Sequence, residues 1–265
     1  MGIRQDVLLA GFLLSDGGIT ARGKESWTIY FRNKDKSVIE EFQKTLIEAC
    51  GKRGYITKRS DETLFIRLHS TKLANRLFSF SKSYRTKACN TFPVCRHLRG
   101  KRSSCKIYGT QKIDGIEYPK AEIPKQVFKN KKLAREFLKI YASCDGGISV
   151  VPARNKRGSL FLVRKVLISV KHPIMSEQLT KLLLNLGFSP VRYKDQIRLI
   201  KREDIQKFKE EIGFIKDAKV SNNSKYLSGY EKNKILDMVI DSYRNPQELL
   251  NFLLKIRFSN RLSRD

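Results

Sequence analysis

Two apolar stretches of helical length organise the hydrophobic pattern of this chain. The first, Val7–Ser15, leads into Asp16–Ile19, and the second, Phe137–Cys144, leads into Asp145–Ile148. The first is apolar nearly all round, as a buried helix is, and in both copies two glycines predict the helix end. The aspartates are 145 − 16 = 129 positions apart, so each copy opens about half of the chain.

The same order of elements follows each copy. Alternating apolar and polar residues predict strands, and apolar positions at helical spacing, with Asp35 as an N-cap and Gly51 as a stop, predict helices. Strands are expected near 26–32, 53–59, 63–69, 147–153, 159–170, 189–194 and 196–201, and the helices between them near 35–50, 71–80, 173–186 and 202–212. We therefore expect an α+β fold of two pseudo-symmetric αββαββα halves with antiparallel sheets, packed through the paired apolar helices.

The two halves are expected to meet near residue 120. Residues 82–120 are less regular, rich in Lys and Arg, and carry three of the five cysteines, so we interpret them as a connector on the basic side. The expected division is 1–120 for the first half with its connector and 121–265 for the second. The second half ends in two further helices, near 230–243 and 246–257.

The charge indicates the partner. Lys and Arg number 54 against 26 acids, a net charge of +28 spread along the chain, which favours a polyanion such as nucleic acid. No apolar run approaches the ~20 residues that span a bilayer. The five cysteines, an odd number, and the lack of a targeting signal indicate an intracellular protein, in a prokaryotic cytoplasm or an organelle matrix.

The paired stretches carry a family resemblance. Leu9–Gly17 (LAGFLLSDG) resembles the LAGLIDADG motif, and Leu138–Gly146 (LKIYASCDG) resembles a degenerate second copy. The chain thereby resembles the single-chain, two-motif LAGLIDADG homing endonucleases. The resemblance implies a monomeric, intron-encoded enzyme whose sheets form a saddle on double-stranded DNA. It also implies cleavage of a long asymmetric target with Mg²⁺, leaving 3′ overhangs, while Mn²⁺ or Ca²⁺ can substitute for binding.

The two aspartates are the expected catalytic and metal-binding residues. Phosphodiester hydrolysis at neutral pH needs a metal, and Mg²⁺ takes hard oxygen ligands from one or two carboxylates. Asp16 and Asp145 would supply these, with help from the carbonyls of Ser15 and Cys144. The resemblance also implies basic or amide residues around the metals, and by position these are Asn33, Lys34, Lys171 and Lys201. Ser70 stands where the first half would need its counterpart of Lys201.

We expect small residues to let the two helices approach closely. They are Ala10 and Gly11 in the first helix, and Ala142 and Ser143 in the second. Polar and basic side chains on the strands and hairpin tips are expected to contact bases and phosphates. They are Arg22, Lys24, Ser26, Thr28, Tyr30, Arg32, Tyr55, Thr57, Arg59, Arg67, Arg154, Lys156, Arg157, Arg164, Arg192, Lys194 and Arg198.

Other interpretations stay open. A single Asp before glycines is usually a turn former, but two copies in matching contexts favour a shared site. A maturase that binds its host intron RNA and a catalytically inactive DNA-binding protein are the alternative functions, and retention of both aspartates favours the nuclease. Cys89, Cys95, His97 and Cys105 lack the usual spacing of zinc ligands, so free thiols are the expected state.

Overall fold

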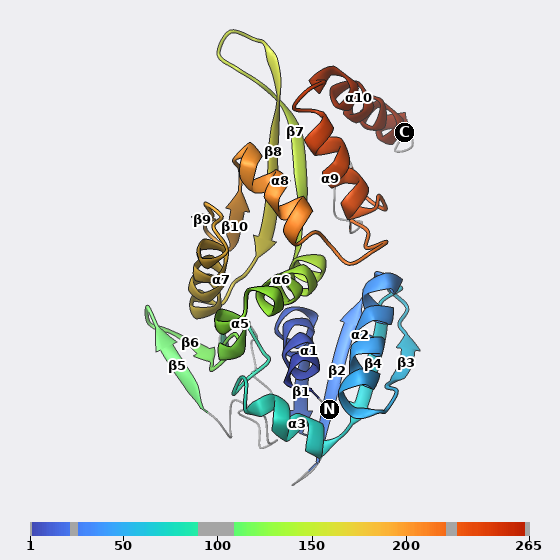
Figure 1. The fold of residues 1–265 in the computed structure, drawn as a ribbon. Helices are drawn as coiled ribbons and strands as arrows, with labels where there is room; N and C mark the ends of the chain where they lie inside the picture. Colours follow the sequence, from blue (N-terminus) through green and yellow to red (C-terminus); the bar gives the residue numbers. More distant parts are fainter. Residues whose placement is uncertain (1, 22–25, 90–108, 221–226, 263–265) are drawn as a thin grey trace.

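The computed structural model describes residues 2–21, 26–89, 109–220 and 227–262, with side chains up to residue 256. Figure 1 shows two sheet-bearing halves on either side of a central helix pair, α1 (Ile3–Asp16) and α6 (Lys131–Asp145). In the part of the chain that is described, no helix is long and apolar enough to cross a membrane.

The first half contains α1 and a four-stranded antiparallel sheet in the order β1-β2-β4-β3. Its elements after α1 are β1 (Gly17–Ala21), β2 (Trp27–Asn33), α2 (Lys36–Cys50), β3 (Tyr55–Lys58), β4 (Leu64–His69) and α3 (Thr71–Phe78). The expected strand and helix order of this half is confirmed.

The second half repeats that order after α6, with the sheet order β7-β8-β10-β9. Its elements are β7 (Gly146–Arg154), β8 (Leu160–Ser169), α7 (Pro173–Asn185), β9 (Val191–Tyr193), β10 (Gln196–Leu199) and α8 (Arg202–Glu211). The helices α9 (Lys232–Asp241) and α10 (Pro246–Leu262) follow and pack on β7 and β8. The expected αββαββα repeat is therefore confirmed in both halves.

Local sequence signals set the ends of α2 as expected. The Asp35 side chain accepts a hydrogen bond from the Ser37 backbone N–H at 2.9 Å, and Gly51 adopts a left-handed conformation with φ 69°. An aspartate can satisfy one unpaired N–H of a first helical turn, and glycine adopts a positive φ without steric strain.

The connector is more regular than its composition indicated. Residues 110–119 form a hairpin of β5 (Thr110–Ile113) and β6 (Ile116–Pro119), so the expectation of irregular structure is wrong there. Asp114 and Gly115, with φ 48° and 79°, make the turn, and Asp-Gly is a common pair in such turns. The short α5 (Lys125–Lys129) then leads into α6.

One continuous apolar core joins the halves. Val7–Leu14 of α1 are all buried, and the ring of Phe12 lies 5.3 Å from that of Phe31 and 5.5 Å from that of Phe42, measured between centroids. The inner faces of the sheets supply Ile29 and Ile66 in one half, and Val166, Ile168 and Ile197 in the other. Because these faces turn toward the helices, the opposite face of each sheet is left open.

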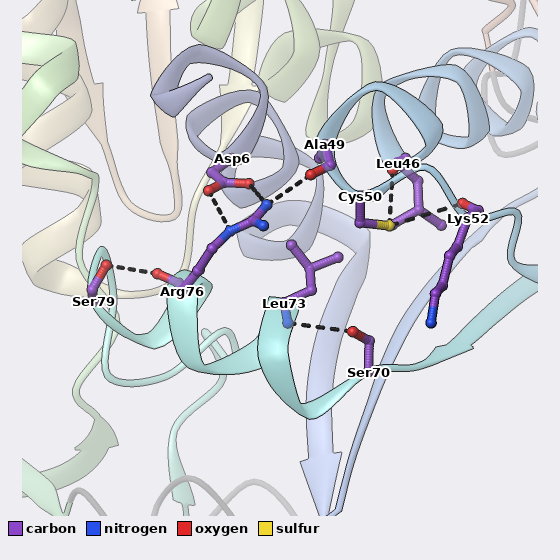
Figure 2. Close-up of polar contacts among 9 residues, drawn as sticks. All are labelled: Asp6, Leu46, Ala49, Cys50, Lys52, Ser70, Leu73, Arg76 and Ser79. Atoms are coloured by element: carbon purple, nitrogen blue, oxygen red, sulfur yellow. Dashed lines mark hydrogen bonds and ion pairs between the residues drawn. The ribbon is translucent and has the colours of Figure 1, made fainter. Parts of the chain in front are cut away.

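An ion pair with two parallel hydrogen bonds ties α1 to α3 (Figure 2). Arg76 donates from Nε to Asp6 Oδ2 at 2.9 Å and from Nη2 to Asp6 Oδ1 at 2.6 Å. The same Nη2 also donates to the Ala49 carbonyl at 2.8 Å, which brings in α2. The pair satisfies the carboxylate of Asp6, whose side chain is 10% exposed, so it fixes three helices around a group that needs a partner.

Replacing Arg76 with Met is expected to lower the free energy of unfolding by about 2–4 kcal/mol, because Asp6 would stay buried without its partner. The matched control is Arg4→Met, which removes an ion pair to Glu136 whose side chains are 51% and 25% exposed. That control should cost less than about 1 kcal/mol in urea melts. Equal losses for the two variants would contradict the role given to Arg76.

Candidate active site

Close packing of α1 against α6 positions the two aspartates. A Cβ at Gly11 would meet the Phe137 ring at 3.2 Å and the Ile140 side chain at 3.4 Å, so this glycine lets bulky residues of the second motif pack against α1. Ala10 and Ala142 are fully buried, as expected for small interface positions. The larger residues of the second copy therefore fill the space opposite Gly11 and do not force the helices apart.

The first glycine of each pair lets a helix end lie against the neighbouring strand. A Cβ at Gly17 would lie 2.7 Å from the Tyr30 carbonyl oxygen, and one at Gly146 would lie 2.8 Å from the Leu167 carbonyl oxygen. Both glycines have an extended backbone, so space and not a positive φ excludes a side chain. The residue before each glycine, Asp16 or Asp145, is thereby held at the junction of helix and sheet.

Asp16 has a defined hydrogen-bond partner. The Asn33 side chain donates from Nδ2 to Asp16 Oδ2 at 2.8 Å, and its Oδ1 accepts from the Asp35 backbone N–H at 2.8 Å, which fixes the amide. Burial raises the pKa of Asp16, while the charge of Arg32 and the bond from Asn33 oppose that rise. The structure thus brings together Asp16 and Asn33, two of the residues expected at the site.

Asp145 lies in a less polar setting. Gly17 pairs with Phe31, and Gly146 pairs with Ile168, so the residue that corresponds to Asn33 in the second half is Val170, which is buried. Loss of water around the carboxyl, followed by repulsion from the charge of Asp16, raises the pKa of Asp145 to about 7. Because the charge of Asp16 acts on Asp145, the two carboxyls share one electrostatic environment where α1 and α6 end.

A lysine that the sequence reasoning missed lies beside this pair. The Lys232 ammonium group, on a residue 5% exposed, donates to the Ser143 carbonyl at 2.7 Å and to the Gly146 carbonyl at 2.8 Å. Burial lowers the pKa of Lys232, and the nearby Asp16 and Asp145 oppose that shift. Lys232 begins α9, so no motif marks it, and only the docking of α9 brings it to the end of α6.

Lys87 is a second positive charge that acts on both aspartates. Its side chain is exposed, and its charge lowers the pKa of Asp16 and of Asp145. The sequence placed it in the basic connector without a role at the centre.

The role expected for Lys34, Lys171 and Lys201 beside the metals stays a prediction. The Lys201 side chain donates to Ser189 Oγ at 3.3 Å, and Lys171 is exposed just after β8. Hydrogen bonds from Thr63 lower the pKa of Asp61, and the charge of Lys34 adds to that effect. The positive charges that lower the pKa values of the two carboxyls come from Arg32, Lys232 and Lys87 and not from these three lysines. A position at a strand end predicts nearness to a helix end but not the direction of a long side chain.

The two residues that precede the aspartates contact each other. A hydrogen bond from Ser15 opposes the rise that burial causes in the pKa of the Cys144 thiol, which still lies well above its usual value. The Ser15 hydroxyl also donates to the Phe12 carbonyl at 2.9 Å. Their side chains therefore belong to the helix interface, and the expectation that their carbonyls bind metal stays a prediction.

The carboxylates fit a magnesium ion by their chemistry. No cluster of three or more His, Cys, Asp or Glu side chains able to hold a metal occurs among the residues that the structure describes. Mg²⁺ does not need such a cluster, because it takes one or two carboxylates and completes its shell with water and substrate phosphate. Two carboxylates whose charges repel one another in a partly buried site would gain from a divalent cation between or beside them.

The open face of the first sheet is basic, as expected, and it is also aromatic. Tyr30 stacks on Phe65 with ring centroids 5.8 Å apart, and the guanidinium carbons of Arg67 and Arg59 lie 4.4 Å and 4.8 Å from the centre of the Phe65 ring. Ser26 and Tyr55 are exposed, and Thr57 Oγ1 donates to the Phe65 carbonyl at 3.4 Å.

Thr28 differs from this expectation. It is buried, and its hydroxyl is hydrogen-bonded to His69 Nδ1 at 2.7 Å, so it is not free to contact a base. Arg22 and Lys24 lie outside the described residues.

Two of the arginines expected on the open face of the second sheet are placed wrongly. Arg164 lies opposite Val150 on the inner face, where Nε donates to Ser242 Oγ and Nη2 to the Ser242 carbonyl, both at 2.8 Å. Burial lowers the pKa of Arg164. It therefore holds the segment after α9 and does not lie on the open face.

Arg192 pairs with the buried Ile197, so it too lies on the inner side, exposed at the edge strand. The turn at Lys194 and Asp195 reverses the alternation that the sequence suggested. Arg198 does lie on the open face, with its guanidinium carbon 3.8 Å from the centre of the Tyr193 ring. Lys194 contacts the same ring at 5.7 Å, and Arg154, Lys156 and Arg157 are exposed at the hairpin tip.

Comparison with known proteins relates this geometry to solved structures. No protein-family model matches the chain, and no curated protein matches it. The LAGLIDADG meganuclease I-AabMI bound to uncleaved DNA has a TM-score of 0.56 at 12% identity, over 95% of this chain and 97% of that one.

The LAGLIDADG homing endonuclease I-SmaMI bound to cleaved DNA has a TM-score of 0.56 at 15% identity, over 95% of both chains. I-SmaMI with uncleaved DNA and calcium ions gives 0.56 at 14%, over 95% of this chain and 97% of that one. At these identities the likeness shows a shared fold, and the resemblance to two-motif LAGLIDADG endonucleases is confirmed at that level.

The setting of Asp145 predicts how stability depends on pH in metal-free protein. Its folded pKa of about 7 lies above the ordinary value of 3.8, so its contribution to stability is fully present below about pH 4 and is lost as the pH rises to about 7. Asp145→Asn should therefore stabilise the protein by on the order of 2 kcal/mol at pH 8 and by much less at pH 5, in urea melts with EDTA.

Asp16→Asn is the matched control and should stabilise less, because Asn33 and Arg32 favour the ionised form of Asp16. A gain for Asp145→Asn that is the same at both pH values would contradict the assigned environment.

Proposed function

We propose that this protein is a metal-dependent, site-specific endonuclease that cuts both strands of a long asymmetric DNA target. The observation that carries the proposal is the packing of α1 on α6, which ends each helix on an aspartate and lets burial and the charge of Asp16 raise the pKa of Asp145. Each half also presents a sheet with an open basic face. One carboxylate per half beside two DNA-binding surfaces suits cleavage of one strand by each half.

Asp16 and Asp145 would hold Mg²⁺, with the carbonyls of Ser15 and Cys144 as further ligands, and Mn²⁺ or Ca²⁺ would support binding. A bound Mg²⁺ would lower the pKa of a bound water and stabilise the charge of the leaving oxygen. The chain's own groups orient this chemistry. Asn33 fixes the Asp16 carboxylate through its Nδ2. Lys232 holds the carbonyls at the end of α6, so it fixes the backbone on both sides of Asp145.

Positive charge on the protein also favours the substrate. The charge of Arg32 acts on Asp16, and that of Lys87 acts on both carboxylates. Both cations would face the phosphates of a bound duplex, where a cation stabilises the extra negative charge of the reacting phosphate. The DNA-bound structures of I-AabMI and I-SmaMI support double-stranded DNA as the substrate, because they share this fold.

The remaining features of the proposal follow the implied enzyme class. The products would carry 3′ overhangs, the active form would be a monomer because one chain holds both halves, and the gene would lie in an intron. The compartment would be a prokaryotic cytoplasm or an organelle matrix. An RNA-binding maturase would need neither aspartate, and an inactive DNA-binding protein would tolerate their loss, so the same variants separate these functions.

Removal of either carboxylate is expected to abolish double-strand cleavage and spare binding. Asp16→Asn and Asp145→Asn should each lower the rate of linear product formation at least ~10²-fold in Mg²⁺ on the selected target, because one half loses its metal ligand. Binding in Ca²⁺, measured by fluorescence anisotropy, should change by less than about threefold, since the DNA contacts remain. Full activity of the double variant would dismiss the metal assignment.

Lys232 is expected to contribute to cleavage as well as to the packing of α9. Lys232→Met keeps the apolar stem but removes the ammonium group, so two carbonyls beside Asp145 lose their donor. Cleavage should fall ~10²-fold while DNA binding in Ca²⁺ stays within about threefold of the unaltered protein.

Lys234→Met, on the exposed side of the same helix, is the matched control and should cleave normally. If both variants cleaved at the same rate, Lys232 would have only a packing role.

A further inference from the structure

The open face of the second sheet carries an apolar surface. Five large side chains on it are 36–49% exposed, whereas among the described residues of the first sheet Tyr55 is the large apolar side chain exposed on that face. We call the five residues the apolar row: Val151, Phe161, Val163, Val191 and Tyr193.

The strand register shows that the apolar row belongs to one face. Val151 pairs directly with Val163, and Phe161 pairs with Ala153 two residues further along the hairpin. The alternate residues, such as Val150 and Leu162, are buried on the inner face. The contact of α9 with this hairpin, through Arg164 and Ser242, also lies on the inner face. The row therefore faces away from the core and from α9.

The charge around the row favours a polyanion. Residues 146–170 contain no Asp or Glu, and Lys165 follows Val163 on the same face. Arg154, Lys156 and Arg157 are exposed at the tip of the hairpin, next to Phe161, and Arg198 lies on the open face beside Val191. The exposed acid beside the row is Asp195, in the turn between β9 and β10, and the β7–β8 hairpin itself carries only cations. An apolar strip with cations along this hairpin suits the groove of a duplex, whose rims are phosphates and whose floor is base edges.

One group on the floor of the major groove is apolar, the C5-methyl of thymine. Residues two apart on a strand are ~6.8 Å apart, which matches about two base pairs along a duplex. Val163 and Phe161, with Val151 beside them, have the spacing to contact thymine methyl groups about two base pairs apart.

We propose that the β7–β8 hairpin reads thymine methyl groups, so that the half-site bound by the second half is richer in A·T pairs than the other. This inference rests on the proposed function, and it takes the open sheet faces to lie in the major groove of the target.

The first test is chemical and acts on the DNA. The full-length protein, in Ca²⁺, selects its target from randomised duplexes, and each thymine of that target is then replaced by deoxyuridine, which lacks only the methyl group. Each contacted methyl in the second half-site should contribute about threefold to fivefold in Kd. The same replacement in the first half-site should change Kd by less than twofold.

The second test acts on the protein. Val151→Ser with Val163→Ser should remove the preference for thymine over deoxyuridine at the affected positions, because the methyl groups lose their apolar partners. Leu184→Ser, at an exposed apolar position on α7, is the matched control and should keep the preference. If the double Ser variant does not fold, Val163→Ser alone and Phe161→Ser are measured in its place.

The outcomes separate this inference from the proposed function. If a selected target is bound and cut, but its Kd does not change when thymine is replaced by deoxyuridine, the inference on thymine methyl groups is wrong and the proposed nuclease function still holds. A protein that selects no duplex overturns both. Concentration-dependent dimers that disappear in the Ser variants, with no thymine preference, would show that the row binds a second copy of the chain and would overturn the proposal.

Discussion

The close packing of α1 on α6 is the contact on which the rest of the structure depends. Gly11 leaves space for Phe137 and Ile140, so the two helices end side by side. Because each helix runs directly into the first strand of its own sheet, this packing also sets how the two sheets lie relative to each other. The same contact thus joins the halves, closes the core and brings two carboxylates to one place.

The two halves share a backbone plan but surround their carboxylates differently. In the first half Asn33 donates to Asp16 and Arg32 adds a charge, whereas in the second half the position of Asn33 is taken by Val170. Lys232, from outside the repeat, supplies a cation at the end of α6. The helix α9, which follows the repeat, is therefore part of the centre and not an appendage. The open face of the first sheet is aromatic and basic, whereas that of the second carries the apolar row beside its cations.

The repeated motif was sufficient to predict the fold and the meeting of Asp16 and Asp145, because apolar periodicity and paired glycines are local signals. Asn33 could be found by position, since a short side chain at a strand end has little freedom. Lys232 could not, because its contact spans 86 residues and needs α9 to dock first. Arg164 and Arg192 were assigned to the wrong face of the sheet for two reasons. Alternation divides the residues of a strand between two faces but does not tell which face packs on the core. The two-residue turn at Lys194 and Asp195 then reverses the alternation between β9 and β10.

The central claim is that Asp16 and Asp145 share one electrostatic environment at the end of the helix pair. The most direct test is the pKa of the Asp145 carboxyl, measured by carbon NMR in metal-free protein with and without the substitution Asp16→Asn. The account predicts a pKa near 7 in the unaltered protein and a lower one in the variant, because the charge of Asp16 is lost. A pKa near 4 in both proteins would contradict it.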